Sequence, residues 1–386
     1  MRGLDPGAVR RYLRDCRTET LSVLEGIVPR GGALDPVLYD LMRDYPLREA
    51  KGLRPALAVA TCQALGGTRE AVLPSAATLE LFHNAFLIHD DIEDGSLQRR
   101  DAPTLHRQHG VPIAINVGDG MLALALEPLL GNMALLGMGR ALRILQIVST
   151  MTRETAEGQA LELSWIRAHR WDLADRDYIR MVYKKTGWYT FVAPLLIGAV
   201  AAGAPLWQAR ALARLGTLLA VAFQIQDDVL NLTGDAHTYG KEIAGDLWEG
   251  KHTLILIHAL RHATATERAE ALAILQRPRP SLMGGRWPAV SAAVDALVAA
   301  GRLDPAGADE IRRAAAGADG VKAEADIAWL QALIARRDSI QYARAVAGDH
   351  ASAAARRLEA AGRWTDDSTH RRFLRGLIDY VVERIQ

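Results

Sequence analysis

An apolar segment at about residues 211–232, polar on one face only, constrains the fold of this chain more than any other feature. Four residues at spacings of three and four share one face of the predicted helix: Gln224, Asp227, Asp228 and Asn231. Most other side chains in the segment are Leu, Ala, Val, Ile or Phe, so the two acids are expected in core-like surroundings. Because unpaired buried carboxylates are costly, this helix needs a metal ion or basic groups opposite it.

A second acidic cluster, Asp90-Asp91-Ile92-Glu93-Asp94, ends another predicted helix. Asp90 and Asp94 are one helical turn apart, and His83 belongs to the same stripe. Carboxylate ligands without histidine or thiolate favour Mg²⁺, which keeps waters and bridges to substrate phosphates. Taken alone, the cluster fits an exposed acidic turn as well as a metal site. Two facing helices of this kind, however, would hold several Mg²⁺ ions against one diphosphate.

The rest of the chain is typical of an all-α protein. Alternating runs of Val, Ile and Thr, which form strands, are nearly absent. Apolar spacing predicts further helices at about 121–147 and 152–166, and Ser75 is expected to cap the helix that leads into the first acidic cluster. Glycine and proline predict joints at Gly110-Val-Pro112 and Gly203-Ala-Pro205.

We expect residues 1–386 to form a single domain. The stretch of about 277–320 is rich in Pro and Gly and is predicted to be a variable insertion with an extra helix or two, followed by C-terminal helices at about 321–386. The uncharged run 191–207 is slightly short for a membrane span, contains two prolines and lacks flanking anchors. We therefore interpret it as a buried helix and predict no transmembrane segment.

Composition and charge narrow the possible partners. The chain is 49% hydrophobic and 24% charged, which is typical of globular proteins. Its formal net charge of +1 gives no global field that attracts nucleic acid or an anionic membrane, so any attraction for phosphates must be local. Cys16 and Cys62 are too few for a disulfide framework, and no apolar leader is recognisable near the start. We expect a cytoplasmic protein that does not bind nucleic acid.

Basic residues accompany both acidic clusters. Arginine offers a bidentate fork to phosphate, whereas lysine acts as a point charge. The candidates are Lys51, Arg54, Arg99, Arg100, Lys185, Lys241 and Lys251. Each would be an ordinary surface charge on its own, but their positions beside the acids favour a diphosphate site.

Together these motifs resemble the trans-isoprenyl diphosphate synthase (polyprenyl synthetase) family. The matching segments span residues 51–251 in the family's order: Lys51-Gly-Leu-Arg54-Pro55, His83 to Asp94, Arg99 to His106, Gly158-Gln159, Lys185-Thr186-Gly187, Phe223 to Asp228 and Gly240 to Lys251. The context is most similar to geranylgeranyl diphosphate synthases. The resemblance implies an all-α isoprenoid synthase fold, with antiparallel helices around a central cavity, and a homodimer.

The resemblance also implies roles for individual residues. About three Mg²⁺ ions would be held by Asp90, Asp94 and Asp227, with Asp91 and Asp228 in support. The allylic diphosphate would be bound by Arg99, Lys185, Gln224, Lys241 and Lys251. Isopentenyl diphosphate would be bound by Lys51, Arg54, His83 and Arg100. Lys185, Thr186 and Gln224 would take part in catalysis, with Thr186 shielding the forming cation.

The implied activity is magnesium-dependent elongation of an allylic diphosphate (dimethylallyl, geranyl or farnesyl) by isopentenyl diphosphate. Phe86, one turn before Asp90, would limit the length of the product, while the small Ala85 leaves room beside it. A C20 product is favoured over the C15 product of a farnesyl diphosphate synthase.

Two other functions remain open. A class I terpene cyclase also ionises an allylic diphosphate, but it needs no second phosphate clamp. A non-catalytic partner subunit commonly lacks one acidic cluster, and both are present here. Three residues depart from the family pattern: Gly52 replaces an Arg, Asp101 a Gly and Asn231 an Asp.

Overall fold

The structure of the chain, a computed structural model, describes most of the sequence. The described residues are 3–234, 243–277, 279, 287–308, 311, 321–360 and 368–383. Lys241, predicted to bind the allylic diphosphate, lies outside them. So does much of the predicted insertion, in which one helix, α16 (Trp287–Ala299), is described.

Within these residues the fold is all-α, as predicted, apart from one two-stranded hairpin in which β1 (Gln98–Arg99) pairs antiparallel with β2 (Ala102–Pro103). The helices of the first half are α1 (Pro6–Ile27), η1 (Asp35–Val37), α2 (Tyr39–Leu47), α3 (Leu53–Ala64), α4 (Arg69–Glu93), α5 (Leu105–His109), α6 (Val111–Leu124), α7 (Leu126–Leu136) and α8 (Met138–Arg167). Those of the second half are α9 (Asp175–Val182), the π-helix η2 (Tyr183–Val192), α10 (Ala193–Ala201), α11 (Leu206–Thr233), α13 (Gly245–Glu249), α14 (Leu254–His262), α15 (Ala265–Gln276), α16, α18 (Glu324–Arg336), α19 (Ser339–Ala360) and α20 (Thr369–Glu383).

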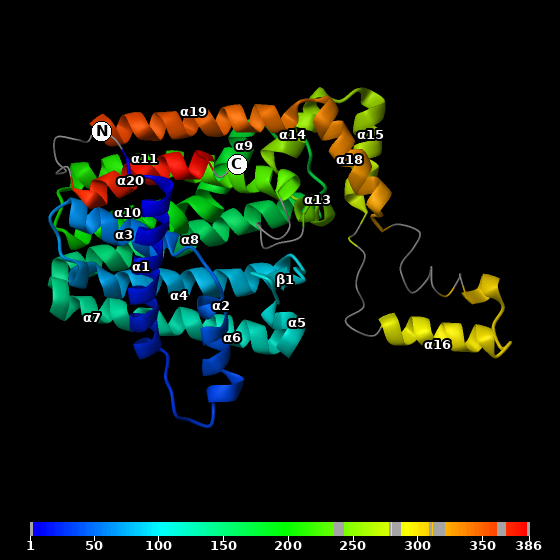
Figure 1. Cartoon of the computed structure of the whole chain (residues 1–386), viewed down its shortest axis with the longest axis horizontal. Helices are drawn as coiled ribbons and strands as arrows, with labels where there is room; N and C mark the ends of the chain where they lie inside the picture. The colour runs from blue at the N-terminus through cyan, green and yellow to red at the C-terminus, as the bar shows by residue number, and fades with distance from the viewer. Residues whose placement is uncertain are drawn as a thin grey trace.

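Helix α11 lies beneath α19 in the view of Figure 1. Its first half, with Leu215 and Leu219, belongs to an apolar cluster shared with α1, α3, α4, α10 and α20. Its second half, with Ile225 and Val229, belongs to another cluster shared with α9, α14, α15 and α18. The acid-bearing turns of α11 therefore lie in buried, core-like surroundings, as its sequence pattern predicted.

Two predicted helix boundaries were wrong. Helix α4 begins at Arg69 because the Thr68 side chain accepts from the Ala71 backbone nitrogen. Ser75 is fully buried inside the helix, where its hydroxyl accepts from the Asn132 amide at 2.9 Å instead of capping. The helix predicted at 121–147 is interrupted at Ala125 and Gly137, whereas α8 continues without a break through the gap predicted after 147.

The predicted joints are confirmed, whereas the buried helix is confirmed only for the middle of its run, because Leu206 and Trp207 at its end are 52% and 57% exposed. Gly110 and Gly203 have φ angles of 87° and 76°, which favour glycine. Helix α10, in the uncharged run 191–207, is almost entirely buried. By length and composition alone, Arg69–Glu93 and Val111–Leu136 would be long and apolar enough to cross a membrane. The first is a core helix that ends in acids, and the second is two helices with an exposed outer side.

Candidate active site

The two acidic clusters lie at the C-terminal ends of α4 and α11 (Figure 1). Beside them is a cavity of about 80 Å³. Its polar lining is Glu162, Lys185, Thr186, Gln224, Asp227, Asp228, Asp246, Lys251, His252 and Thr253. The structure thus brings six of the predicted polar site residues, both members of the second acidic pair among them, to one cavity.

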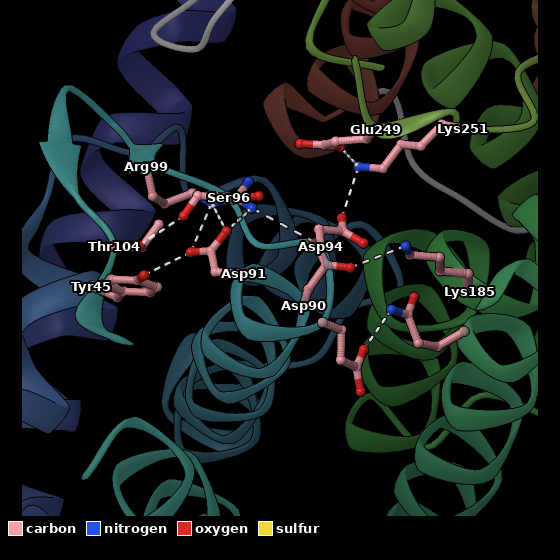
Figure 2. A network of polar contacts seen from close by, with 12 residues as sticks. Tyr45, Asp90, Asp91, Asp94, Ser96, Arg99, Thr104, Lys185, Glu249 and Lys251 are labelled. Carbon is pink, nitrogen blue, oxygen red and sulfur yellow. Dashed lines mark hydrogen bonds and ion pairs between the residues drawn. The ribbon is translucent and has the colours of Figure 1, made fainter. Parts of the chain in front are cut away.

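Lys185 links the first acidic cluster to α8. Its ammonium lies 3.0 Å from the Asp90 carboxylate (Figure 2). The same ammonium lies 2.5 Å from the Glu162 carboxylate. Burial opposes ionisation of Asp90, but Lys185 and Lys251 hold the pKa of Asp90 below its usual value. Glu162, which is buried, was not predicted. Its position one helical turn after Gly158 of the Gly158-Gln159 motif is a sequence signal that would have found it.

Lys251 makes the corresponding contact with the other end of the cluster. Its ammonium lies 2.9 Å from Asp94 and 2.8 Å from Glu249 (Figure 2). Burial lowers the pKa of Lys251, yet the charges of Asp94 and Glu249 more than offset it and raise that pKa. Burial raises the pKa of Asp94 to about 7 although Lys251 opposes it. Lys251 and Lys185 together therefore do not offset the burial of the ionised Asp94, and a further cation would favour its ionised form.

Asp91 points away from this side of α4 and is fully buried. The Tyr45 hydroxyl donates to one of its oxygens at 2.6 Å, and the Arg99 guanidinium donates to both. Arg99 lies 3.7 Å from Asp90 as well, so one arginine joins both acids (Figure 2). The Tyr45 oxygen also accepts from the Leu105 backbone nitrogen at 3.1 Å. Tyr45 was not predicted, and no local pattern marks it.

The second acidic pair is held from within the helical core. The Tyr178 hydroxyl donates to Asp228 at 2.7 Å, and the Gln224 amide donates to the other Asp228 oxygen at 2.9 Å. Burial raises the pKa of Asp228 well above its usual value, and the charges of Asp246 and Asp227 add to that rise. Gln224 thus contacts an acid, and any contact with a diphosphate remains a prediction.

Asn231 replaces the family's acid without leaving a gap in the structure. Its side-chain oxygen accepts from the Asp246 backbone nitrogen at 3.2 Å, and its carbonyl accepts from Ala244 at 2.7 Å. These two hydrogen bonds hold the start of α13 against α11, and Asp246 of α13 lines the cavity. Asp246 itself lies in a matched motif but was not predicted to belong to the site.

The π-helix η2 positions Lys185 and Thr186. Thr186 is buried and lines the cavity. Helix α8 approaches η2 so closely that a Cβ at Gly158 would lie 2.2 Å from the Lys185 backbone nitrogen. Glycine is therefore required at position 158, which explains this part of the motif in physical terms.

A second cationic group, formed by Arg54 and Arg100, lies near the β1–β2 hairpin. The Arg54 guanidinium donates to the Thr190 hydroxyl at 2.8 Å and lies 4.7 Å from the Tyr189 ring centre. Arg100 reaches to 3.4 Å from the His83 Nε2. Burial, then Arg54 and Arg100, hold the pKa of His83 well below its usual value, so this ring is neutral. Burial lowers the pKa of Arg100 to about 10; Glu80 opposes this shift and Arg54 adds to it.

Three of the four residues predicted for isopentenyl diphosphate are thus brought together, and neither Arg54 nor Arg100 forms an ion pair within the described part of the chain. Lys51 is exposed just before α3 and lies outside the network of contacts described above. Gly52 has a φ of 64°, and a Cβ there would lie 2.6 Å from the Arg17 Cβ. The arginine that is usual in the family would not fit at this position.

Asp101 is the third departure, and its place in the fold explains why glycine is usual. Arg100 and Asp101 form the turn between β1 and β2, with φ angles of 53° and 58°. Two-residue hairpin turns favour residues that tolerate positive φ, and aspartate is among them. Asp101 is exposed, so its charge faces solvent at the edge of the cationic group.

The residues predicted to limit product length lie deeper in α4. Ala85 is fully buried. The ring of Phe86 lies 6.0 Å from that of Phe82 and 5.8 Å from that of Tyr189. Three aromatic rings therefore gather one to two turns before Asp90.

The acids fit a magnesium site that a substrate completes. No group of three or more His, Cys, Asp or Glu side chains arranged to hold a metal occurs in the described residues. Mg²⁺ commonly takes one or two carboxylates together with substrate phosphates, so it does not need a complete protein cage. The candidate donors Asp90, Asp94 and Asp227 are carboxylates, and burial raises the pKa of Asp94 despite the nearby Lys251, so a bound cation would favour its ionised form.

The all-α bundle ends two of its helices in acidic clusters, pairs Lys185 and Lys251 with the first of them, and holds a second cationic group at Arg54 and Arg100. This arrangement is typical of an enzyme of the diphosphate-handling, isoprenoid synthase class. Comparison with known sequences agrees, since residues 35–282 match the polyprenyl synthetase family. The chain belongs to the polyprenyl synthetase family and is a prenyltransferase.

Individual relatives agree with this assignment. The short chain isoprenyl diphosphate synthase of Methanocaldococcus jannaschii is 37% identical over 241 residues, which cover 62% of this chain and 72% of the relative. The geranylgeranyl diphosphate synthase of Methanosarcina mazei is 37% identical over 224 residues, 58% of this chain and 67% of the relative. A crystal structure of geranylgeranyl pyrophosphate synthase from Corynebacterium glutamicum, complexed with isoprenyl diphosphate and magnesium, has a TM-score of 0.75 at 25% identity and covers 99% of this chain and 100% of that one.

Proposed function

We propose that this prenyltransferase joins isopentenyl diphosphate to an allylic diphosphate at the cavity lined by α8, α9, η2 and α11, beside the acidic end of α4. The observation that carries the proposal is the presence of two separate cationic groups. Lys185 and Lys251 form ion pairs with Asp90 and Asp94. Arg54 and Arg100 instead lie near the neutral His83. A cyclase would need one diphosphate site, but two sites suit an enzyme with two diphosphate substrates.

In the proposed reaction the bond between the allylic carbon and its diphosphate breaks, and the electron pair leaves with the diphosphate. Lys185 and Lys251 would neutralise part of that charge in a site from which water is largely excluded. Mg²⁺ held by Asp90, Asp94 and Asp227 would supply the remaining neutralisation of the leaving group. The contacts of Asp91 with Arg99 and Tyr45 favour a supporting role for this acid.

The second substrate supplies the electrons for the new bond. Arg54, His83 and Arg100 would hold isopentenyl diphosphate so that its double bond faces the allylic carbon. The alkene carbon bonds to that carbon, and the product then loses a proton to the departing diphosphate. The buried Thr186 would face the forming cation, and no protein nucleophile is required.

Steady-state kinetics of Arg54→Met test the assignment of the two sites. Loss of one guanidinium–phosphate contact is expected to raise the KM for isopentenyl diphosphate about tenfold or more and to leave the KM for the allylic substrate unchanged. Arg107→Met, at an exposed position in α5, is the matched control. An equal rise in both KM values would contradict two separate sites.

We infer a C20 product, geranylgeranyl diphosphate. The aromatic group of Phe82, Phe86 and Tyr189 would stop the growing chain, and one of the relatives described above carries that product in its name. Phe86→Ala is expected to lengthen the product, as judged by chromatography of the dephosphorylated alcohols. An unchanged product distribution would show that the limit lies elsewhere.

We further propose a homodimer. Exposed apolar side chains lie along α6, α7 and the start of α8, and a large patch of this kind is typical of an interface. They are Val111, Ile115, Leu126, Leu130, Met133, Leu135, Met138 and Leu142. In sedimentation velocity, Leu130→Glu is expected to shift the protein toward monomer, while Leu34→Glu, a similarly exposed leucine outside this face, is not. A monomeric wild type would contradict the proposal.

A single domain and a cytoplasmic location are proposed as well. The two apolar clusters meet on α11, so one cooperative urea transition is expected, and two separate transitions would oppose it. Cys16 and Cys62 are both free and buried, which suits a reducing compartment. Cell fractionation would test the location.

A further inference from the structure

A basic groove lies at the end of the bundle opposite the acidic clusters, where α11 begins and α19 ends (Figure 1). Its volume is about 680 Å³. The residues that line this basic groove are Trp207, Arg210, Ala211, Arg214, Ala353, Arg356, Arg357 and Ala360. None of them belongs to the candidate active site.

The four arginines of the basic groove carry unneutralised charge. All four are exposed, and within the described residues none forms an ion pair with a carboxylate. Other arginines of the chain are paired, as Arg261 is with Asp175 and Arg277 with Asp326. Since the net charge of the chain is only +1, this groove is a local cluster of positive charge on a nearly neutral protein.

Two large apolar side chains stand beside these arginines. Leu206 and Trp207, in the first turn of α11, are 52% and 57% exposed. Arg210 and Arg214 follow one and two turns later on the same helix. Exposed Trp and Leu next to several arginines are typical of surfaces that lie in the headgroup region of an anionic bilayer. A site for a small phosphate would need the cations without the apolar pair.

The position of the groove suits a membrane surface. Trp207 precedes Asp227 by twenty residues of α11, which is about 30 Å along the helix axis. Phe86 likewise precedes Asp90 in α4, so an apolar product tail that starts at the acids would point toward the end of the bundle that bears the groove. This step rests on the proposed function, whereas the exposed arginines and the apolar pair do not.

We propose that the basic groove, together with Leu206 and Trp207, docks the protein on an anionic phospholipid bilayer. The four arginines attract the headgroup phosphates, and the attraction falls off within a Debye length. The two apolar side chains enter the interface. The enzyme is then a peripheral membrane protein whose product end faces the lipid.

Vesicle co-sedimentation of the full-length protein tests the proposal. The probes are vesicles of phosphatidylcholine alone and of equal parts phosphatidylcholine and phosphatidylglycerol. Binding is expected to the anionic vesicles only and to weaken as salt rises. Arg210→Gln/Arg214→Gln should weaken it about thirty-fold, from the usual contribution of each basic residue near such a surface. The control is Arg10→Gln/Arg14→Gln, an exposed pair at the same spacing on α1.

Three outcomes would overturn the proposal. The wild type would remain in the supernatant with both vesicles if the groove served an acidic protein segment instead. Equal losses in the groove and control variants would mean that binding follows total charge. If the triple variant Arg210→Gln/Arg214→Gln/Trp207→Ser bound anionic vesicles as strongly as the wild type, the bilayer would contact another part of the protein. Prenyltransferase activity measured on the same samples, without vesicles, separates failure of docking from failure of the proposed function, since groove variants are expected to retain it.

Discussion

Gly158→Ala is a small change that tests how Lys185, which we propose is catalytic, is positioned. The added Cβ would lie 2.2 Å from the Lys185 nitrogen and 2.6 Å from the Lys185 Cα. Ordinary contacts begin at 3.4 Å, so the nearest approach is about 1.2 Å too short. Both atoms are backbone and cannot rotate away. Helices α8 and η2 must therefore separate, which moves Lys185 relative to Asp90 and Glu162.

The size of the effect follows from that displacement. Overpacking of this kind costs about 1–3 kcal/mol of stability. A displacement of about 1 Å in a catalytic group lowers the rate about a hundredfold. We expect kcat/KM to fall about a hundredfold, while urea unfolding shows a protein that is still folded.

Gly139→Ala is the matched control, because it lies in the same helix and its Cβ would meet no atom within 4 Å. Its activity and stability are expected to stay at wild-type levels or to improve slightly. A Gly158→Ala enzyme with wild-type kcat/KM would refute the view that the close approach of α8 sets the position of Lys185.

Three further substitutions test neighbouring parts of the account. Tyr45→Phe leaves the buried Asp91 short of a donor and should lower the urea unfolding free energy by about 1–3 kcal/mol. Glu162→Gln removes one of the two carboxylates that hold Lys185 and should lower kcat about tenfold at saturating substrates. Gly52→Arg restores the family's residue, but positive φ and crowding should cost about 1–3 kcal/mol in unfolding assays without a lower KM for isopentenyl diphosphate.

Local patterns predicted the elements of this fold better than their ends. The polar stripe on an apolar background was sufficient to predict α11, because that period belongs to a helix with one polar face. The start of α4 was wrong because Thr68 and Ser75 are both good caps, and only tertiary packing around Asn132 decides between them. The break at Gly137 did carry a local signal, since its φ of 81° favours glycine, whereas no such signal marks Ala125.

Most residues of the candidate site were likewise predicted where a local motif marks them and missed where it does not. Asp90 was predicted from its spacing and Lys185 from its place in a family motif, and in the structure the two lie 3.0 Å apart. Tyr45 was missed because it meets Asp91 across 46 positions of sequence, and no local signal reports such a contact. The sequence also did not reveal which groups each predicted residue contacts. Arg99 was expected at a diphosphate, whereas in the structure it joins Asp91 to Asp90.

Incubation of the purified protein with Mg²⁺, isopentenyl diphosphate and each allylic starter in turn tests the central claim most directly. Chromatography of the dephosphorylated products should show linear alcohols ending at C20, formed only when isopentenyl diphosphate is consumed. A cyclic hydrocarbon formed from the allylic diphosphate alone, or no turnover with any starter, would contradict the account.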